Sequence, residues 1–347
     1  MELASTCDAA GNNATVEETS NTTHEFVQFY AHAQFVTGLI LYPILCTFGL
    51  VGNSISLVVL RHRKMVSSTN LFLSALAAAD ILKLLNDLLY FLDLVLLRVH
   101  PAAGNALFGH MYPVSHYIFN QSACVTAWLT VSVAVERYLS VCHAARAKAV
   151  CTLARARVIS AAVILSMSVV ALPSALRYVR IVLVDSCTNQ TTYDIDISAL
   201  GRTERFMVAY TWTQNLLRSI IPLFALCILN CCIIHALRRR RRVKGKSWSA
   251  KNRITLMLIV VIVVFIVCIL PDAVMSTCFG FGYVDEKNLL AKGVREFTDT
   301  LLLIHSASNF IIYCVCSKGF RDIFLQIVGC EAPKVQQTTT ISLRSVV

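Results

Sequence analysis

The chain has 347 residues, of which 56% are hydrophobic and only 15% are charged, and its mean hydropathy is +0.64. A soluble protein of this length has about a quarter of its residues charged, so the composition excludes a chain that is covered by water on all sides. The formal net charge of +11 is compatible with binding to nucleic acid or with basic loops beside a membrane.

Seven apolar runs follow one another along the chain, and each is long enough to cross a bilayer. A helix of about 20 mostly apolar residues spans the ~30 Å hydrocarbon core. The runs lie at about 35–60, 70–97, 108–135, 157–176, 206–237, 254–279 and 296–316. They are too long and too separate for one soluble core. The sequence therefore predicts an all-α integral membrane protein with a seven-transmembrane helix bundle at 35–317.

The polar segment 1–34 precedes the first run. It has neither a basic start nor an apolar core, so we expect no cleavable signal peptide, and the first run would act as the insertion signal. Asn13, Asn21 and Asn189 begin Asn-X-Thr sequences, which are acceptors for N-glycosylation. All three fall on the same side of the predicted bundle, so we expect that side, with residues 1–34, to be extracellular.

Basic residues gather on the other side, most densely in the run RRRRRVKGK that begins at Arg238. An excess of Lys and Arg marks cytoplasmic loops. We therefore expect a multi-pass protein of the plasma membrane with its N-terminus outside and its C-terminus inside. The net charge then reflects topology, and nucleic acid is not an expected partner.

Polar residues interrupt several runs, where burial in hydrocarbon is costly. Such residues must face the bundle interior and satisfy one another. For Asn53, two explanations are equally good: a hydrogen bond that joins two helices, or a functional role. A carboxylate at Asp80 needs a cation, a proton or a dense set of donors, so a switch or an ion site is favoured there.

Glu136 and Arg137 stand at the cytoplasmic end of the third run. An exposed ion pair is the ordinary explanation for such charges at a helix end. Against a bundle interior, however, the carboxylate can hold the guanidinium in one position. If the bundle opens inward, the arginine can turn to a cytoplasmic partner, so the pair is a plausible bistable element.

Six short motifs occur in order, one on each of six runs. They are Gly52-Asn53, Leu76-Ala-Ala-Ala-Asp80, Glu136-Arg137-Tyr138, Pro222, Phe265-x-x-Cys268-x-x-Pro271 and Asn309-Phe-Ile-Ile-Tyr313. Together they resemble the rhodopsin-like (class A) G-protein-coupled receptors over about residues 35–328. The stretches VCHAARAKAVCTLARAR, IIPLFALCILN and SASNFIIY are similar to the FMRFamide-type neuropeptide receptors of invertebrates.

The resemblance implies that an extracellular ligand promotes nucleotide exchange on a heterotrimeric G protein. The residues that it implies for this switch are Glu136, Arg137, Tyr138, Asn230, Asn309 and Tyr313. It also implies a sodium-linked core at Asp80, Thr126 and Asn309, and no other cofactor or metal. The chain lacks catalytic motifs, so we do not expect an enzyme, and it lacks the repeated halves of a transporter or channel.

The chain departs from the family pattern at three telling places. Phe310 replaces the usual proline of the seventh run, and Ile269 replaces the usual tryptophan of the sixth. Tyr112 stands about where most relatives have the cysteine that is bonded to the second outer loop. We therefore expect that disulfide to be absent, with Cys187 free or bonded to Cys7 or Cys278.

The ligand class follows partly by exclusion. Amine receptors carry an aspartate where this chain has Phe119, and opsins carry a lysine where it has Leu303. The outward-facing candidates for ligand binding are Asp87, Tyr90, Phe119, Gln214, Arg218, Asp272 and Asp299. Their acids suit a neuropeptide with a cationic C-terminal part. Two alternatives stay open: Asp272 or Asp299 pairs with Arg218 or Arg295, or the ligand is not a peptide.

The chain after the seventh run begins with a regular apolar stripe. Phe320, Ile323, Phe324 and Ile327 recur at helical spacing, which predicts an amphipathic helix at 318–329 on the inner membrane surface, with a disordered tail as the alternative. Cys330 is placed for palmitoylation or stays an unmodified thiol. Residues 330–347 predict a disordered cytoplasmic tail for receptor kinases and arrestin, with a possible PDZ-binding end at Val347.

Overall fold

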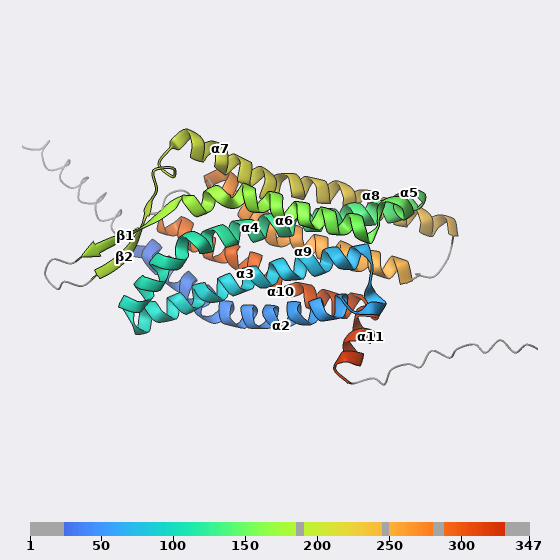
Figure 1. Ribbon diagram of the computed structural model, residues 1–347, viewed down its shortest axis with the longest axis horizontal. Helices are drawn as coiled ribbons and strands as arrows, with labels where there is room; N and C mark the ends of the chain where they lie inside the picture. The colour runs from blue at the N-terminus through green and yellow to red at the C-terminus, as the bar shows by residue number, and fades with distance from the viewer. Residues whose placement is uncertain (1–23, 185–190, 245–249, 280–287, 330–347) are drawn as a thin grey trace, which may run out of the picture.

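The computed structural model describes residues 24–184, 191–244, 250–279 and 288–329 (Figure 1). Several of the predicted positions lie outside these residues. They are the glycosylation sites Asn13, Asn21 and Asn189, the cysteines Cys7 and Cys187, the palmitoylation site Cys330, and the tail that ends at Val347.

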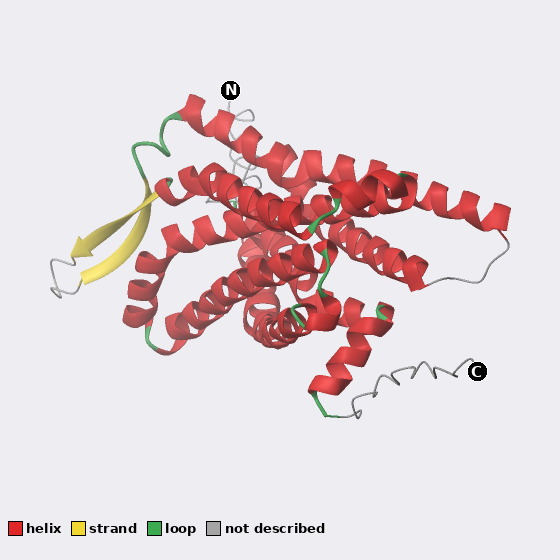
Figure 2. Ribbon diagram, turned by 45° about the vertical axis from the view of Figure 1, so that its right-hand side comes forward, coloured by secondary structure: helices red, strands yellow, loops and turns green. Residues whose placement is uncertain are grey.

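The described residues form seven long helical segments, which lie side by side in an elongated bundle (Figures 1 and 2). The first runs from His24 through the π-helical turn η1 (Phe35–Leu41) into α2 (Tyr42–Leu60). The others are α3 (Ser68–Val99), α4 (Pro101–Cys142), α6 (Leu153–Leu176), α7 (Glu204–Asn215) continued by the π-helical turn η3 (Leu216–Ile220) and α8 (Ile221–Lys244), α9 (Ala250–Phe279) and α10 (Leu289–Cys316). The short segments η2 (Arg63–Met65) and α5 (Ala144–Val150) lie between long ones.

Six of these segments in the described part of the chain are long and apolar enough to cross a membrane. Helix α3 is not among them, because Asp80, Lys83, Asp87 and Asp93 interrupt its apolar sequence. These four side chains are all buried, since α3 packs against both α2 and α4. The predicted seven-helix bundle is confirmed.

The bundle has an apolar exterior and polar groups inside. Val58, Val169 and Phe224 are among the large apolar side chains that stay exposed on its outer faces, whereas Asn53, Asp80 and Gln214 are fully buried. This arrangement suits a hydrocarbon solvent, in which exposed apolar side chains cost nothing and polar groups must pair inside the protein.

A two-stranded antiparallel hairpin lies at one end of the bundle, and α11 (Lys318–Ile327) lies at the other (Figure 1). Strand β1 (Tyr178–Val184) pairs with β2 (Thr191–Ile197), with Tyr178 opposite Ile197 and Val184 opposite Thr191. Its β-branched residues favour a strand. The hairpin packs on α4, where a Cβ at Gly109 would lie 2.8 Å from Cβ of Tyr193, so only glycine permits this approach.

The turn η3 has a cause in the sequence. Its π-helical hydrogen bonds join residues five apart, as from the N–H of Ile221 to the carbonyl of Leu216. The next bond would come from residue 222, but Pro222 has no N–H to donate. The carbonyl of Leu217 is satisfied instead by Trp128 of α4, whose indole Nε1 donates to it across 2.9 Å.

Small residues let α10 lie against α2 (Tyr42–Leu60). A Cβ added at Gly49 would lie 3.0 Å from Cβ of Ala307, and one at Gly52 would lie 2.8 Å from Cβ of Phe310. At the same contact, Asn53 Nδ2 donates to the carbonyl of Ser306 across 2.8 Å. Asn53 thus forms a hydrogen bond between two helices. This is one of the two explanations that its position in the sequence allows.

Candidate functional site

A cavity of about 380 Å³ opens at the hairpin end of the bundle, between the first helical segment, α3, α4 and α10. Four of the predicted ligand-binding residues line it: Asp87, Tyr90, Phe119 and Asp299. The acidic and basic side chains in its wall, apart from His116, are the carboxylates Asp87, Asp93, Glu296 and Asp299 and the cations Lys292 and Arg295. The structure therefore gathers more carboxylates than cations around this space.

Two of the four carboxylates already have a cationic partner. Lys83 Nζ lies 2.5 Å from Oδ2 of Asp87, and both side chains are buried. The same Nζ lies 5.4 Å from the centroid of the Phe119 ring, close enough for a cation–π contact. Arg295 Nε lies 3.3 Å from Oδ2 of Asp299. Both ion pairs join residues four apart on one helix.

The other two carboxylates have no ion pair within the described residues. Glu296 accepts hydrogen bonds from the hydroxyls of Tyr90, at 2.8 Å, and Thr37, at 3.1 Å. Asp93 is only 1% exposed, and its Oδ1 has no hydrogen-bond partner in the described part of the chain. A buried carboxylate oxygen without a donor is costly, so the unsatisfied Oδ1 of Asp93 requires an explanation.

The remaining predicted ligand residues do not line this cavity. Arg218 and Asp272 form a buried ion pair between η3 and α9, and Arg218 Nη1 also lies 3.5 Å from Oδ1 of Asn120 on α4. Gln214 donates to the carbonyl of Val170 on α6 across 2.9 Å. The structure thus forms two of the ion pairs that the sequence left open as alternatives to ligand binding, Arg218–Asp272 and Arg295–Asp299. Of the predicted ligand residues, four line the cavity, and the other three join helices to one another.

Asp80 lies at the centre of the bundle, where α3, α4 and α10 meet. Asn309 Nδ2 donates to its Oδ2 across 2.8 Å. Asp80 Oδ1 and Thr126 Oγ1 are buried, and neither has a hydrogen-bond partner among the described residues. The structure places the three predicted ion-site residues on these three helices, and two unsatisfied oxygens remain there.

The Glu136–Arg137 pair lies at the end of α4 that is remote from the hairpin. Arg137 Nη2 lies 3.3 Å from Glu136 Oε1, and the two side chains are 13% and 6% exposed. The first turn of α3 holds both: Ser68 donates to the same Glu136 oxygen, and Thr69 accepts a hydrogen bond from Arg137 Nη2. The pair is therefore bound inside the bundle rather than solvated.

The other predicted switch residues are not joined to Arg137 by any hydrogen bond among the residues that the structure describes. Tyr138 turns to His143, with its hydroxyl 3.3 Å from Nε2. Asn230 of α8 is buried, and its amide nitrogen and oxygen both lack partners in the described part of the chain. Tyr313 packs against Phe320 of α11, with ring centroids 5.5 Å apart.

Sequence reasoning did not assign Asp93 and Glu296, which line the outer cavity, or Lys83, which pairs with the lining residue Asp87. The spacing of four residues between Lys83 and Asp87 was an available signal, because it places both on one face of a helix. Glu296 likewise precedes Asp299 by three residues. The contacts that these residues make with other helices could not be predicted from the spacing of residues along the chain.

The family model described as "7 transmembrane receptor (rhodopsin family)" matches residues 52–313, and the chain therefore belongs to this family. The chain is 28% identical over 301 residues to the FMRFamide receptor of Drosophila melanogaster, and the matched region covers 83% of this chain and 53% of that receptor. It is 28% identical over 340 residues to the sex peptide receptor of Drosophila melanogaster (87% of this chain, 74% of the relative). It is 27% identical over 296 residues to somatostatin receptor type 1 of Rattus norvegicus (83% and 70%).

The chain thus spans about half the length of the FMRFamide receptor. The resemblance that the six motifs carry is confirmed, and with it the assignment to the rhodopsin-family receptors. The protein is a multi-pass membrane protein of the rhodopsin family.

Proposed function

We propose that this receptor binds a cationic peptide at the hairpin end of the bundle and promotes nucleotide exchange on a heterotrimeric G protein at the α11 end. The observation that carries the ligand class is a pair of carboxylates in the wall of the outer cavity, Asp93 and Glu296, for which the described residues form no ion pair. In this proposal the N-terminus and the hairpin lie outside the cell and the C-terminus lies in the cytoplasm, which is the orientation that the basic loops favour.

A ligand guanidinium or ammonium would donate to the free Oδ1 of Asp93 and to Glu296, and charge-assisted hydrogen bonds of this kind are strong. The volume of about 380 Å³ lies near the small end of ligand sites, so the cavity accepts the end of a peptide rather than its whole length. Relatives named for FMRFamide, sex peptide and somatostatin support a peptide ligand.

The Arg218–Asp272 pair would transmit the effect of ligand binding from the outer cavity toward the inner end of the bundle. It joins η3 to α9, and Asn120 extends the cluster to α4. A buried ion pair tolerates little distortion, because separating its charges in a low-dielectric interior is costly. A peptide that shifts α9 or η3 would therefore have to move both together. This linkage takes the place of the tryptophan that Ile269 replaces.

At the inner end, the ligand-bound state would release Arg137 from Glu136 and Thr69. The free guanidinium would then face the G protein, and the unpartnered amide of Asn230 on α8 would accept a hydrogen bond from the rearranged Arg137 or Tyr313. A ligand shifts such an equilibrium only by its preference for one of the two states.

The core residues fit a sodium ion. Hard cations take oxygen ligands, and Asp80 Oδ1 and Thr126 Oγ1 are two buried oxygens without partners among the described residues. A bound Na⁺ would offset the charge of Asp80 and hold α3 to α4. Asn309 already satisfies the second carboxylate oxygen.

Modifications of the ends stay predictions from the sequence. They are glycosylation at Asn13, Asn21 and Asn189, palmitoylation at Cys330, engagement of residues 330–347 by receptor kinases and arrestin, and a PDZ contact at Val347. Helix α11, with Phe320 and Ile323 buried, would lie on the inner membrane surface before this tail.

The test is a panel of peptides with basic C-terminal parts, read by G-protein dissociation in cells that express the receptor. Asp93→Asn and Glu296→Gln should each raise the agonist concentration required by at least about tenfold. Glu204→Gln is the matched control, because Glu204 is an exposed acid at the start of α7 and does not line the cavity. Activation by a neutral, non-peptide ligand alone, with both variants unchanged, would contradict the proposed ligand class.

A further inference from the structure

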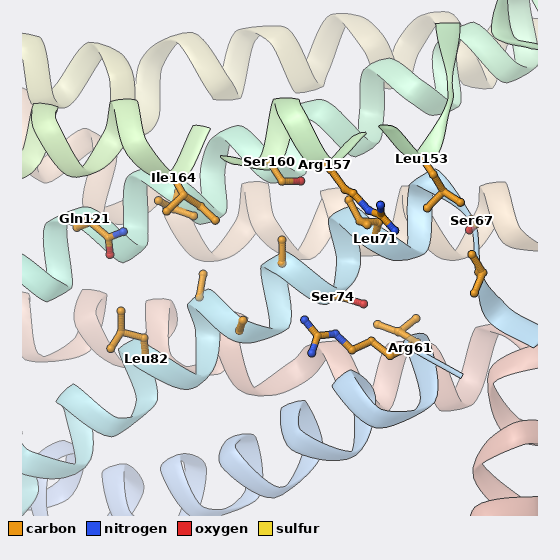
Figure 3. A pocket seen from close by; sticks show the side chains of 16 residues that line it. Arg61, Ser67, Leu71, Ser74, Leu82, Gln121, Leu153, Arg157, Ser160 and Ile164 are labelled. Carbon is orange, nitrogen blue, oxygen red and sulfur yellow. The ribbon is translucent and has the colours of Figure 1, made fainter. Parts of the chain in front are cut away.

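A second cavity, of about 670 Å³, lies on the flank of the bundle between the ends of α2 and the helices α3, α4 and α6 (Figure 3). Exposed apolar side chains in its wall, Val66, Leu82 and Ile164, show that it is open on the outer face. An exposed apolar face on a membrane-spanning bundle is expected to face lipid. We call this cavity the flank groove.

The flank groove owes its depth to small side chains of α3. Ala75, Ala78 and Ala79 line it where longer residues would fill the space between α3 and α6. The α3 residues that line it extend over 71–82, which corresponds to about 16 Å of helix. This length matches one leaflet of the ~30 Å hydrocarbon core, so the groove can hold an acyl chain along its axis.

The two ends of the groove differ in charge. Arg61 and Arg157 lie toward the end marked by Ser67 and Leu153, whereas Leu82, Gln121 and Ile164 lie toward the other (Figure 3). Ser67 and Leu153 stand at the starts of α3 and α6, which belong to the α11 end of the bundle. The charged end is therefore at the level of the cytoplasmic headgroups in the proposed orientation.

Neither arginine has a carboxylate partner among the described residues. Both side chains are exposed. Guanidinium groups match the geometry of a phosphate, and the cytoplasmic leaflet is rich in anionic lipids. Ser160 adds a second polar feature: it lines the groove, it is 6% exposed, and its hydroxyl has no partner in the described part of the chain.

We propose that the flank groove binds one anionic phospholipid of the cytoplasmic leaflet. Its phosphate lies between Arg61 and Arg157, the Ser160 hydroxyl donates to an oxygen of its glycerol ester region, and one acyl chain follows the alanines of α3. The site lies beside the switch, because Ser67 lines the groove and its neighbour Ser68 donates a hydrogen bond to Glu136. It goes beyond the proposed function and relies on it only for the orientation of the bundle.

The experiment uses the purified full-length receptor, freed of lipid in detergent and titrated with dioleoyl phosphatidylserine or dioleoyl phosphatidylcholine. Native mass spectrometry counts the lipid adducts at equal lipid concentrations. We expect phosphatidylserine adducts to exceed phosphatidylcholine adducts, and Arg61→Gln/Arg157→Gln to reduce the phosphatidylserine adducts by at least about fivefold. The matched control is Arg63→Gln/Arg155→Gln, which removes the same charge from neighbouring positions that do not line the groove.

A second pair of variants tests the chain-binding part without a change of charge. Ala78→Phe fills the groove and should also reduce phosphatidylserine adducts, whereas Val169→Phe, at an outward position of α6 that does not line it, should not. Size-exclusion profiles show that each variant is folded. Soluble glycerophosphoserine should not compete, since it lacks the acyl chains.

Any one of four outcomes would overturn the proposal. An equal loss of adducts in both double-arginine variants would assign the effect to general surface charge. Unchanged adducts in Ala78→Phe would place the lipid elsewhere. Equal binding of phosphatidylcholine, or displacement of phosphatidylserine only by a sterol, would make the groove a site for neutral lipid.

Discussion

Arg218 of the π-helical turn η3 and Asp272 of α9 form an ion pair whose side chains are only 5% and 7% exposed. Asn120 and Ser276 complete the contact, at 3.5 Å from Nη1 and 3.4 Å from Nη2 of Arg218. The pair therefore joins three helices at one buried point. Because charges in an apolar interior depend on their partners, this point is sensitive to the loss of either residue.

Asp272→Asn should lower the free energy of unfolding by about 3–5 kcal/mol, because it leaves the buried guanidinium without its carboxylate. The double variant Arg218→Met/Asp272→Leu removes both charges and should recover most of that loss. Thermal unfolding of the purified receptor measures both effects. Asp299→Asn is the comparison, and its effect should be smaller, since the Arg295 and Asp299 side chains are 33% and 19% exposed.

The same variant separates a structural role from a ligand contact. If Asp272→Asn receptors were as stable as the wild type but required about tenfold more agonist, Asp272 would be a ligand residue, as the sequence first indicated.

Arg137→Ala should abolish agonist-dependent nucleotide exchange while the receptor still reaches the cell surface. The proposed G-protein contact depends on this guanidinium, whereas Ser68 still donates a hydrogen bond to the buried Glu136 when Arg137 is lost, so we expect the fold to persist. GTPγS binding in membranes, together with surface labelling, measures both quantities. Undiminished exchange would remove Arg137 from the mechanism.

Thr69→Ala should raise nucleotide exchange in the absence of ligand, because Thr69 accepts a hydrogen bond that holds Arg137 in the closed arrangement. A hydrogen bond to a charged group contributes about 1.5–3 kcal/mol, enough to shift a two-state equilibrium by about tenfold or more. Thr130→Ala is the control, since the Thr130 hydroxyl donates only to a carbonyl of its own helix among the described residues. Equal basal exchange in the two variants would contradict this role.

Tyr112→Ala should loosen the hairpin from α4. The Tyr112 ring packs edge-on to Tyr178 of β1, with centroids 5.1 Å apart, and such a pair contributes about 0.5–1.5 kcal/mol. The rate of limited proteolysis within the hairpin measures the effect. Tyr117→Ala is the control, because the Tyr117 hydroxyl contacts the carbonyl of Ser168 on α6 instead.

The same contact bears on the predicted absence of the family disulfide. Tyr112 offers no sulfur, and Cys278 is an exposed free cysteine in the structure, while Cys187 and Cys7 lie outside the described residues. Peptide mapping of the unreduced protein should find no bond from Cys187 to Cys124 or Cys142 of α4. Detection of either bond would refute the prediction.

Gly52→Ala should destabilise the packing of α10 on α2, because the new Cβ would lie 2.8 Å from Cβ of Phe310. Overpacking of this kind costs about 1–3 kcal/mol. Gly319→Ala is the control: its nearest atom would be 3.8 Å away, so the change should be neutral or slightly stabilising. A Gly52→Ala receptor with unchanged thermal unfolding would show that the two helices can separate at no cost.

The sequence predicted the bundle and the central polar residues well. Apolar runs of about 20 residues predict spans because a bilayer leaves the backbone no other partner than its own helix. Asp80 and Asn309 could be assigned to the interior before their 2.8 Å hydrogen bond was known, since neither could face hydrocarbon. Helix α3 shows the limit of composition alone, because its charges exclude it from the apolar segments although it lies in the bundle.

Sequence by itself therefore determined the membrane class, the seven helices, their order and the family, because each depends on local hydropathy or on short motifs along the chain. Only the tertiary structure decided which charges are neutralised. It pairs Asp272 with Arg218, 54 positions away in the chain, and leaves Asp93 without a cation among the described residues. The physical reason is that the energy of a charge depends on its neighbours in space, and these come from helices that no local pattern brings together.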